Sequence, residues 1–192
     1  MGTRSDIIVH CADGKWRRIY CHWDGYLSHN GRILFDHYTD QKKNEKLVGL
    51  GDISSLQANI GRKHPFDAPS YGSKKWEEYQ KKYGDMCLAY GRDRGEEGTE
   101  AHVFDTLFDT WPDNQTGTEF TYVWCSNPRA AVGERPDPAN AKWWVGDPDK
   151  GTQTLIDLGD ALTGKKVITP AVKAFGGNFV VGQHLPHDPN NN

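Results

Sequence analysis

The sequence lacks any long hydrophobic run: no window approaches the roughly 18 consecutive apolar residues that a membrane-spanning helix requires. Hydrophobic residues make up only 36% of the 192 residues, and the mean hydropathy is -0.77. A strong charge of one sign is also missing, because 26 acidic and 23 basic side chains leave a formal net charge of -3. These absences argue against a membrane protein and make nucleic acid unsuitable as the main partner, although they are compatible with a local basic patch.

Cysteine is scarce as well, with four residues at positions 11, 21, 87 and 125 and no C-x-x-C pair among them. No secretion signal precedes them, so we expect reduced thiols and a cytoplasmic protein. Aromatic residues, in contrast, are plentiful: seven Trp, eight Tyr and seven Phe. Because each of them buries a large area, a packed core is expected despite the low hydropathy.

The segment "DIIVHCADGKWRRIYCHW" predicts a β-hairpin, because two β-rich runs flank the turn-forming pair Asp13-Gly14. A two-residue turn at this pair would place Ile7 opposite Tyr20. Apolar residues occur on both faces of the hairpin, which indicates a central position in a sheet.

The rest of the chain predicts an α+β protein: an antiparallel sheet with two or three helices and long loops. We expect a single domain over residues 3–185 and a frayed tail at 186–192. Residues 57–73 contain two glycines and two prolines and predict a loop. The expected regular elements are helices at 39–51 and 73–84, with Thr39 and Ser73 as their N-caps, and strands at 118–126 and 141–147. In the strand at 118–126, Phe120, Tyr122 and Trp124 are expected on one side and Val123 and Cys125 on the other. The segment 152–164 fits either a short helix or an edge segment.

Chemically reactive residues are densest in "IYCHWDGYLSHNG", residues 19–31. His22 and Asp24 are two apart on an extended segment and project to the same face beside Tyr20, and an imidazole with an orienting carboxylate can perform acid–base catalysis. Two-apart partners on a strand diverge, however, so Asp24 can instead cap the turn beside a structural histidine. We favour that interpretation and keep His22 and Asp24 as catalytic residues only for an enzymatic alternative.

Metal and cysteine chemistry are not expected. His22, Asp24, His29 and His37 lie within sixteen positions, but their spacing matches no compact ligand pattern. A nucleophilic thiolate needs a positioned base, and the best-placed candidate, Cys87, has no identifiable one. The sequence therefore predicts no metal and no cofactor.

A second chemically distinctive place is the loop "YGRDRGEEG", residues 90–98. Arg92 and Arg94 bracket Asp93 between glycines, and two guanidinium groups on one loop can hold a phosphate or carboxylate. We therefore take Tyr20, Arg92, Asp93 and Arg94 as the candidate ligand-binding residues. In the structural alternative, the arginines pair with the neighbouring carboxylates and stay solvated.

Three blocks of the sequence support a family resemblance: "TRSDIIV" followed by "DGKWRRIYCHWDGYLSHNGRILFDHYTDQKKNEKLVGLGDISSL", then "KHPFD", then "CLAYGRDRGE". Over roughly residues 3–100 the chain resembles a family of small uncharacterised proteins from tailed phages and prophages. The resemblance implies a phage origin and a role inside an infected bacterium. It implies no particular activity.

Two functions fit these observations. The first is a phage accessory protein without catalytic activity, which binds a host protein or a small anionic ligand during host takeover or counter-defence. The alternative is a hydrolase or transferase acting on a phosphorylated or nucleotide substrate, with His22 as acid or base, Asp24 as its orienting group and Arg92 and Arg94 as a phosphate clamp. The alternative requires the two reactive blocks to meet at one pocket.

Overall fold

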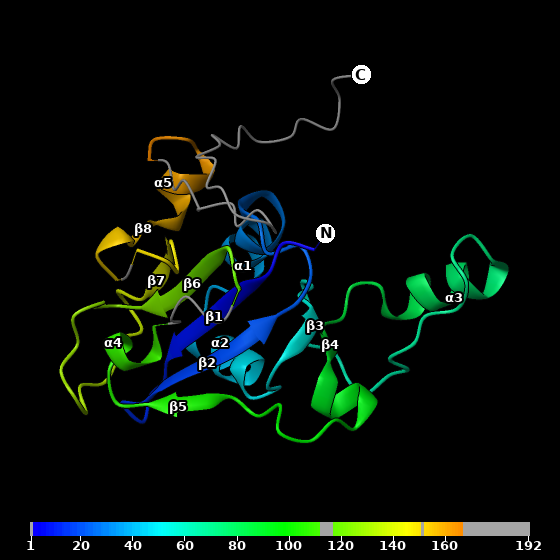
Figure 1. Cartoon of the computed structure of the whole chain (residues 1–192), viewed down its shortest axis with the longest axis horizontal. Coiled ribbons are helices and arrows are strands. Elements are labelled where there is room, and N and C mark those ends of the chain that lie inside the picture. Colours follow the sequence, from blue (N-terminus) through cyan, green and yellow to red (C-terminus); the bar gives the residue numbers. More distant parts are fainter. Residues whose placement is uncertain (1, 112–116, 151, 167–192) are drawn as a thin grey trace, which may run out of the picture.

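The computed structural model describes residues 2–111, 117–150 and 152–166. It is an α+β structure built on one mixed eight-stranded sheet of order β4-β3-β2-β1-β6-β7-β8, in which β5 also pairs with β2 (Figure 1). The strands are β1 (Ser5–His10), β2 (Trp16–Cys21), β3 (Ile53–Ser55), β4 (Leu88–Ala89), β5 (His102–Phe104), β6 (Phe120–Cys125), β7 (Lys142–Gly146) and β8 (Ile156–Asp157). The helices are α1 (Arg32–His37), α2 (Gln41–Val48), α3 (Lys74–Tyr83), α4 (Leu107–Thr110) and α5 (Leu158–Leu162), with short turns η1 (Leu27–Gly31), η2 (Tyr90–Arg94) and η3 (Thr152–Thr154).

The sheet is not purely antiparallel, and that part of the sequence prediction is wrong. β1 pairs parallel with β6, and β2 pairs parallel with β3. Both parallel junctions join strands that are far apart in the sequence, where no turn signal exists from which the direction of pairing could be inferred. The pairs β1–β2 and β6–β7 are antiparallel, as predicted.

The opening hairpin is present, but its register differs by one residue from the expected one. The turn is longer than two residues: the N–H of Cys11 donates to the carbonyl of Lys15, and Gly14 has a positive φ of 79°. Tyr20 consequently lies opposite Asp6 and not opposite Ile7. Because side chains alternate between faces, this one-residue shift moves Asp6 to the face that carries Tyr20.

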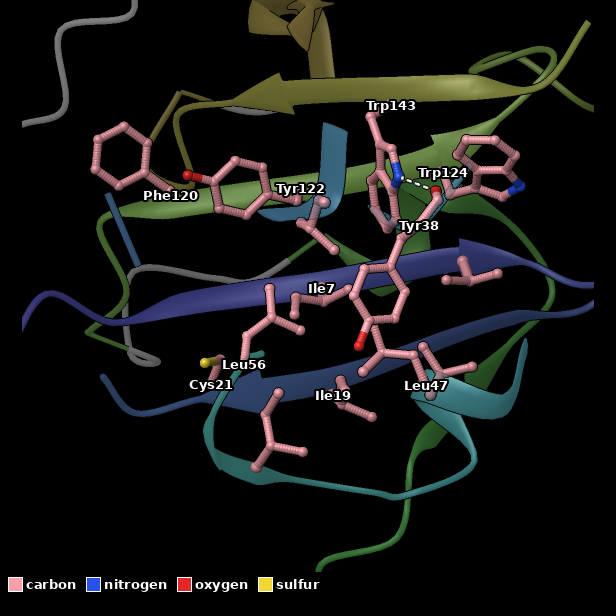
Figure 2. Packing of buried hydrophobic residues seen from close by; sticks show 14 of the residues in the cluster. Ile7, Ile19, Cys21, Tyr38, Leu47, Leu56, Phe120, Tyr122, Trp124 and Trp143 are labelled. Carbon is pink, nitrogen blue, oxygen red and sulfur yellow. Dashed lines mark hydrogen bonds between the residues drawn. The ribbon is translucent and has the colours of Figure 1, made fainter. Parts of the chain in front are cut away.

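One face of the sheet carries the main core. Side chains from β1, β2, β6 and β7 pack there with Tyr38 and with Leu47 of α2 (Figure 2). Residues of α1 and α5 belong to the same cluster. The indole Nε1 of Trp143 donates to the carbonyl of Tyr38 over 2.7 Å, so the buried N–H of this tryptophan has a hydrogen-bond partner. The predicted division of β6 is confirmed: Phe120, Tyr122 and Trp124 face this core, and Val123 and Cys125 face the other side.

The opposite face carries a smaller apolar cluster, which α4 covers with Leu107. Ile8, Trp16 and Val123 belong to this cluster. The remainder of this face is polar, with Asp6 from β1 and Arg18 and Tyr20 from β2. This second face therefore combines an apolar half with a polar half.

Residues 61–85, called the arm below, project from the β4 edge of the sheet (Figure 1). The predicted helix is confirmed as α3, with the Ser73 side chain accepting from the N–H of Trp76 and Gly84 following the last turn. No residue of α3 is buried. Its aromatic side packs on its own loop: the Tyr79 hydroxyl donates to the carbonyl of Pro65 over 2.8 Å, and the Tyr83 ring stacks on His64.

The other predicted elements are found with small differences. The helix expected at 39–51 is α2, and its N-cap is Asp40, whose carboxylate accepts from the N–H of Lys43, and not Thr39. The segment 152–164, which the sequence left open between a short helix and an edge segment, contains η3, β8 and α5. The tail predicted at 186–192 and the end of the predicted domain at 185 lie outside the described residues.

Candidate functional site

The opening stretch forms a tightly packed turn at the end of β2. Asp24 is the one non-glycine residue with a positive φ, 57°, among the described residues. Gly25 follows it, and a Cβ there would lie 2.7 Å from the carbonyl carbon of Arg4, so only glycine fits without a backbone shift. The Tyr122 hydroxyl donates to the Gly25 carbonyl over 2.8 Å. The turn is therefore fixed by contacts with β6 and with the N-terminal segment.

A buried asparagine fixes the same turn from inside. The Asn30 side-chain amide donates to Ser5 Oγ and Cys21 Sγ, each over 3.2 Å, and to the carbonyl of Trp23 over 3.3 Å. Because these partners come from β1, β2 and the turn, Asn30 ties three parts of the stretch together. This arrangement supports the scaffold interpretation of residues 19–31.

His22 contacts Tyr20 and not Asp24. The Tyr20 Oη and His22 Nδ1 atoms lie 3.1 Å apart, and both side chains are half-buried. Burial raises the pKa of Tyr20 to about 12, so this hydroxyl stays protonated. Among the described residues no hydrogen bond or ion pair joins His22 to Asp24, and the orienting carboxylate of the enzymatic alternative is not found in contact with its imidazole.

Sequence reasoning missed a polar cluster beside Tyr20. Asp6 is 3% exposed, and the Thr118 hydroxyl donates to its Oδ2 over 2.7 Å. Burial raises the pKa of Asp6 to about 6, with Arg18 opposing and Asp52 adding to the shift. The Tyr20 N–H donates to Asp52 Oδ1 over 2.8 Å. The cluster could have been found from the sequence only with the correct hairpin register, which places Asp6 opposite Tyr20.

Arg92 is occupied by internal hydrogen bonds. Its Nε and Nη2 donate to the Asp93 carboxylate, each over 2.8 Å, its Nη1 donates to the carbonyl of Ile60 over 2.7 Å, and its Nη2 also donates to the carbonyl of Cys87. Four hydrogen bonds from a guanidinium with five N–H groups leave one N–H for a ligand. This geometry supports a structural role for Arg92, and ligand binding by it stays a prediction.

Asp93 is the other half of this pair, with a side chain that is 0% exposed. Besides Arg92, its carboxylate accepts from the N–H of Ala89 over 2.8 Å and from the N–H of His64 over 3.1 Å. Burial acts to raise the pKa of Asp93, but the hydrogen bonds from Arg92 and the backbone outweigh it and lower the pKa. Ile60 comes directly before the arm and His64 lies near its start, whereas Cys87 and Ala89 follow its end, so the pair joins the two ends of the arm.

Arg94 lies apart from Arg92. Its side chain is 58% exposed, it lies 3.6 Å from Glu96, and its guanidinium covers the ring of Phe66. A hollow of about 700 Å³ does open beside η2, but its three acidic residues, Glu96, Glu97 and Glu100, outnumber the two basic ones, Arg17 and Arg92. The surroundings of this hollow are thus acidic, which disfavours an anion there.

The two reactive blocks are neighbours in the sheet without sharing a site. Tyr20 lies on β2, and the Arg92 turn follows β4, with β3 between the two strands. Two strand spacings separate their backbones by about 10 Å. No hydrogen bond, ion pair or ring contact among the described residues joins either arginine to Tyr20, His22 or Asp24. These contacts do not bring the two blocks together, and the enzymatic alternative stays a prediction.

All four cysteines are free and buried. Burial raises the thiol pKa to about 11 for Cys11 and to about 12 for Cys21 and Cys125, and it also raises that of Cys87. A buried thiol with a raised pKa is a poor nucleophile.

We expect all four thiols to react slowly with a thiol-specific chromogenic reagent in the native protein at pH 8, at least about 100-fold more slowly than in denaturant, because so little thiolate is present or accessible. The absorbance of the released product measures both rates. One fast-reacting native thiol, traced by peptide mapping, would contradict the structural interpretation of that cysteine.

Metal and membrane sites were searched over the part of the chain that the structure describes. Within residues 2–111, 117–150 and 152–166, no group of three or more His, Cys, Asp or Glu side chains is arranged to hold a metal ion. Within the same ranges, no helix has the length and apolar composition needed to cross a membrane.

Comparison with known proteins does not extend these observations. No protein family model, no curated protein and no solved structure matches the chain. The functional argument accordingly depends on the residues of this chain, and the resemblance to phage proteins stays an expectation from the sequence.

Proposed function

We propose that the protein is a non-catalytic binding protein, a phage accessory protein that acts on a host protein in the cytoplasm of the infected bacterium. The reactive side chains predicted from the sequence support this proposal by their contacts. The cysteines are buried, Arg92 and Asp93 bond to each other, and His22 bonds to Tyr20. Among the described residues, no cysteine thiol is hydrogen-bonded to a histidine or a carboxylate that could serve as its base.

The arm is the part of the molecule that we assign to binding. No residue of its helix α3 is buried, so α3 adds no side chain to the core of the sheet. Its two ends are nevertheless held in place by the buried Arg92–Asp93 pair, which bonds to Ile60, His64, Cys87 and Ala89. A projecting element with a fixed base loses little conformational entropy on binding.

The tip of the arm carries the observation on which the proposal mainly depends. Tyr71 is 87% exposed, the largest exposure among the described large hydrophobic residues. Its ring lies 4.7 Å, centroid to centroid, from that of Trp76 in an edge contact. Tyrosine and tryptophan are enriched among the residues that dominate protein–protein binding energy, so this pair is suited to fill a pocket in a partner.

The charge of the arm indicates the kind of partner. Residues 61–85 contain six basic and four acidic side chains, whereas the whole chain has a net charge of -3. Lys74 and Lys75 follow the tip directly and are exposed. A partner with an apolar pocket and an acidic rim would complement this surface.

Affinity purification from a bacterial lysate tests the proposal. The bait is the full chain, and the captured proteins are compared by quantitative mass spectrometry with those captured by Tyr71→Ala. We expect one host protein to be enriched by the wild type and depleted about 10-fold or more by Tyr71→Ala, which corresponds to the loss of one dominant contact.

Phe108→Ala is the matched control, because Phe108 on α4 is also an exposed aromatic residue, at 79%. We expect it to capture the same host protein as the wild type. Equal capture by wild type and Tyr71→Ala, or a loss with Phe108→Ala alone, would contradict binding through the arm.

A further inference from the structure

A second hollow, of about 450 Å³, lies between α2 and the segment that leads into the arm. It is lined by Lys42, Lys43 and Lys46 of α2 and by Ile60 and Gly61. Asp40 also borders it, with its carboxylate accepting from the N–H of Lys43 as the helix cap, so the lining carries three positive charges and one negative charge. Three lysines around one concave surface distinguish this hollow from the acidic one beside η2.

Two of these lysines lack a neutralising partner. Neither Lys42 nor Lys46 has a hydrogen bond, an ion pair or a ring contact with any described residue, and both are exposed. They are four residues apart on α2 and therefore neighbours on its surface, where like charges repel. Glu45 lies between them in the sequence but forms no ion pair with either lysine, and its Oε1 accepts from the N–H of Ala12 over 2.6 Å and from the Gln41 side chain over 2.8 Å.

The third lysine fixes the wall of the hollow. Lys43 Nζ donates to the carbonyl of His37 over 2.6 Å and to that of Ala58 over 2.8 Å, so it connects α1 and α2 to the segment before the arm. Lys43 therefore has a structural role, and its positive charge lies at the hollow.

The segment that forms the opposite wall adds further positive charge. Gly61 has a φ of +72°, and a Cβ there would lie 2.6 Å from the Cβ of Met86, so the chain passes at a spacing that only glycine permits. Arg62 and Lys63 follow immediately, both exposed and without a side-chain contact to any described residue. The exposed cations that line the hollow itself are Lys42 and Lys46, and Arg62 and Lys63 come directly after Gly61 in the chain.

We propose that this basic hollow binds a diphosphate group, either free or as part of a nucleotide. The ammonium groups of Lys42 and Lys46, four residues apart on α2 and both lining the hollow, match an anion with two adjacent charged centres better than one with a single centre. The site is separate from the tip of the arm, and the proposal does not depend on the arm binding a protein.

Isothermal titration of the full chain with sodium pyrophosphate at low salt tests this site, with Lys42→Gln/Lys46→Gln as the test variant. We expect saturable binding of one pyrophosphate per chain and an affinity about 10-fold lower in the test variant, since two exposed ion pairs are lost. Inorganic phosphate should bind about 10-fold more weakly than pyrophosphate, because it offers one charged centre. Thermal melting confirms that the test variant is folded.

Lys81→Gln/Lys82→Gln on α3 is the matched control, because it removes the same charge from another exposed helix. It should bind pyrophosphate within about two-fold of the wild type. Three results would overturn the proposal: pyrophosphate does not bind saturably, both double variants weaken binding equally, or phosphate and pyrophosphate bind with equal affinity. Adenosine diphosphate distinguishes the source: tighter binding than pyrophosphate supports a nucleotide, and equal binding supports a free diphosphate.

Discussion

Replacing Asp93 by alanine is expected to lower the free energy of unfolding by about 3–5 kcal/mol. The substitution leaves the guanidinium of Arg92, which is 17% exposed, without its carboxylate, and it removes the acceptor of two backbone N–H groups, those of His64 and Ala89. Breaking a buried ion pair from one side costs more than the pair itself contributes, because the remaining charge is unpaired. Urea unfolding followed by circular dichroism measures the change.

Glu96→Gln is the control for this prediction. Glu96 and Arg94 form the exposed ion pair of the same loop, with side chains 48% and 58% exposed. Such pairs contribute between about 0 and 1 kcal/mol, so the control should unfold close to the wild type. If Asp93→Ala is as stable as Glu96→Gln, the Arg92–Asp93 pair does not hold the base of the arm.

Replacing Asp6 by asparagine is expected to stabilise the protein at pH 8 by about 3 kcal/mol. Burial raises the pKa of Asp6 from 3.8 to about 6 in the folded chain, so the folded state holds its proton more tightly than the unfolded state. The stability that this carboxyl contributes is therefore complete below pH 3.8 and is lost as the pH rises through 6. A shift of about two units corresponds to about 3 kcal/mol.

The pH dependence distinguishes this cause from a general effect of the substitution. The difference in unfolding free energy between Asp6→Asn and wild type should be near zero at pH 4 and largest at pH 8, as measured by urea unfolding at each pH. Asp36→Asn, which removes a half-exposed carboxylate paired with Arg32, should show no such rise. An Asp6 variant that is less stable than the wild type at pH 8 would contradict the burial of an ionised Asp6.

Local signals predicted much of the fold. Ser73 before and Gly84 after a helical aromatic pattern located α3, and alternation along residues 120–125 assigned each side chain of β6 to its face. These signals depend on neighbours in the sequence. The parallel pairing of β1 with β6 depends on partners more than one hundred residues apart, and no local pattern encodes its direction.

The hairpin register shows how a small local error spreads. Asp13-Gly14 was correctly identified as the turn, but the turn closes from Cys11 to Lys15, and the one-residue difference places Asp6 beside Tyr20. Because the predicted register placed Ile7 and not Asp6 opposite Tyr20, the sequence did not predict the polar cluster around Asp6.

The candidate site was predictable only in part. The sequence singled out residues 90–94, but it could not show that Arg92 donates to carbonyl groups on both sides of the arm. A charged residue next to its opposite charge has the same sequence pattern whether it binds a ligand or holds a loop. The projection of the arm also depends on tertiary contacts. The sequence of residues 57–73 predicts a loop but not that this loop projects from the sheet.

The affinity of the captured host protein for three purified baits tests the central claim most directly. The baits are the wild type, Tyr71→Ala, and His22→Ala/Asp24→Asn, the last chosen because asparagine also accepts the positive φ of 57° at position 24. Biolayer interferometry should give an affinity for His22→Ala/Asp24→Asn within about two-fold of the wild type and a loss of about 30-fold for Tyr71→Ala. Unchanged affinity of Tyr71→Ala together with loss of binding by the His22 and Asp24 variant would show that the opening stretch, and not the arm, is the functional part of the molecule.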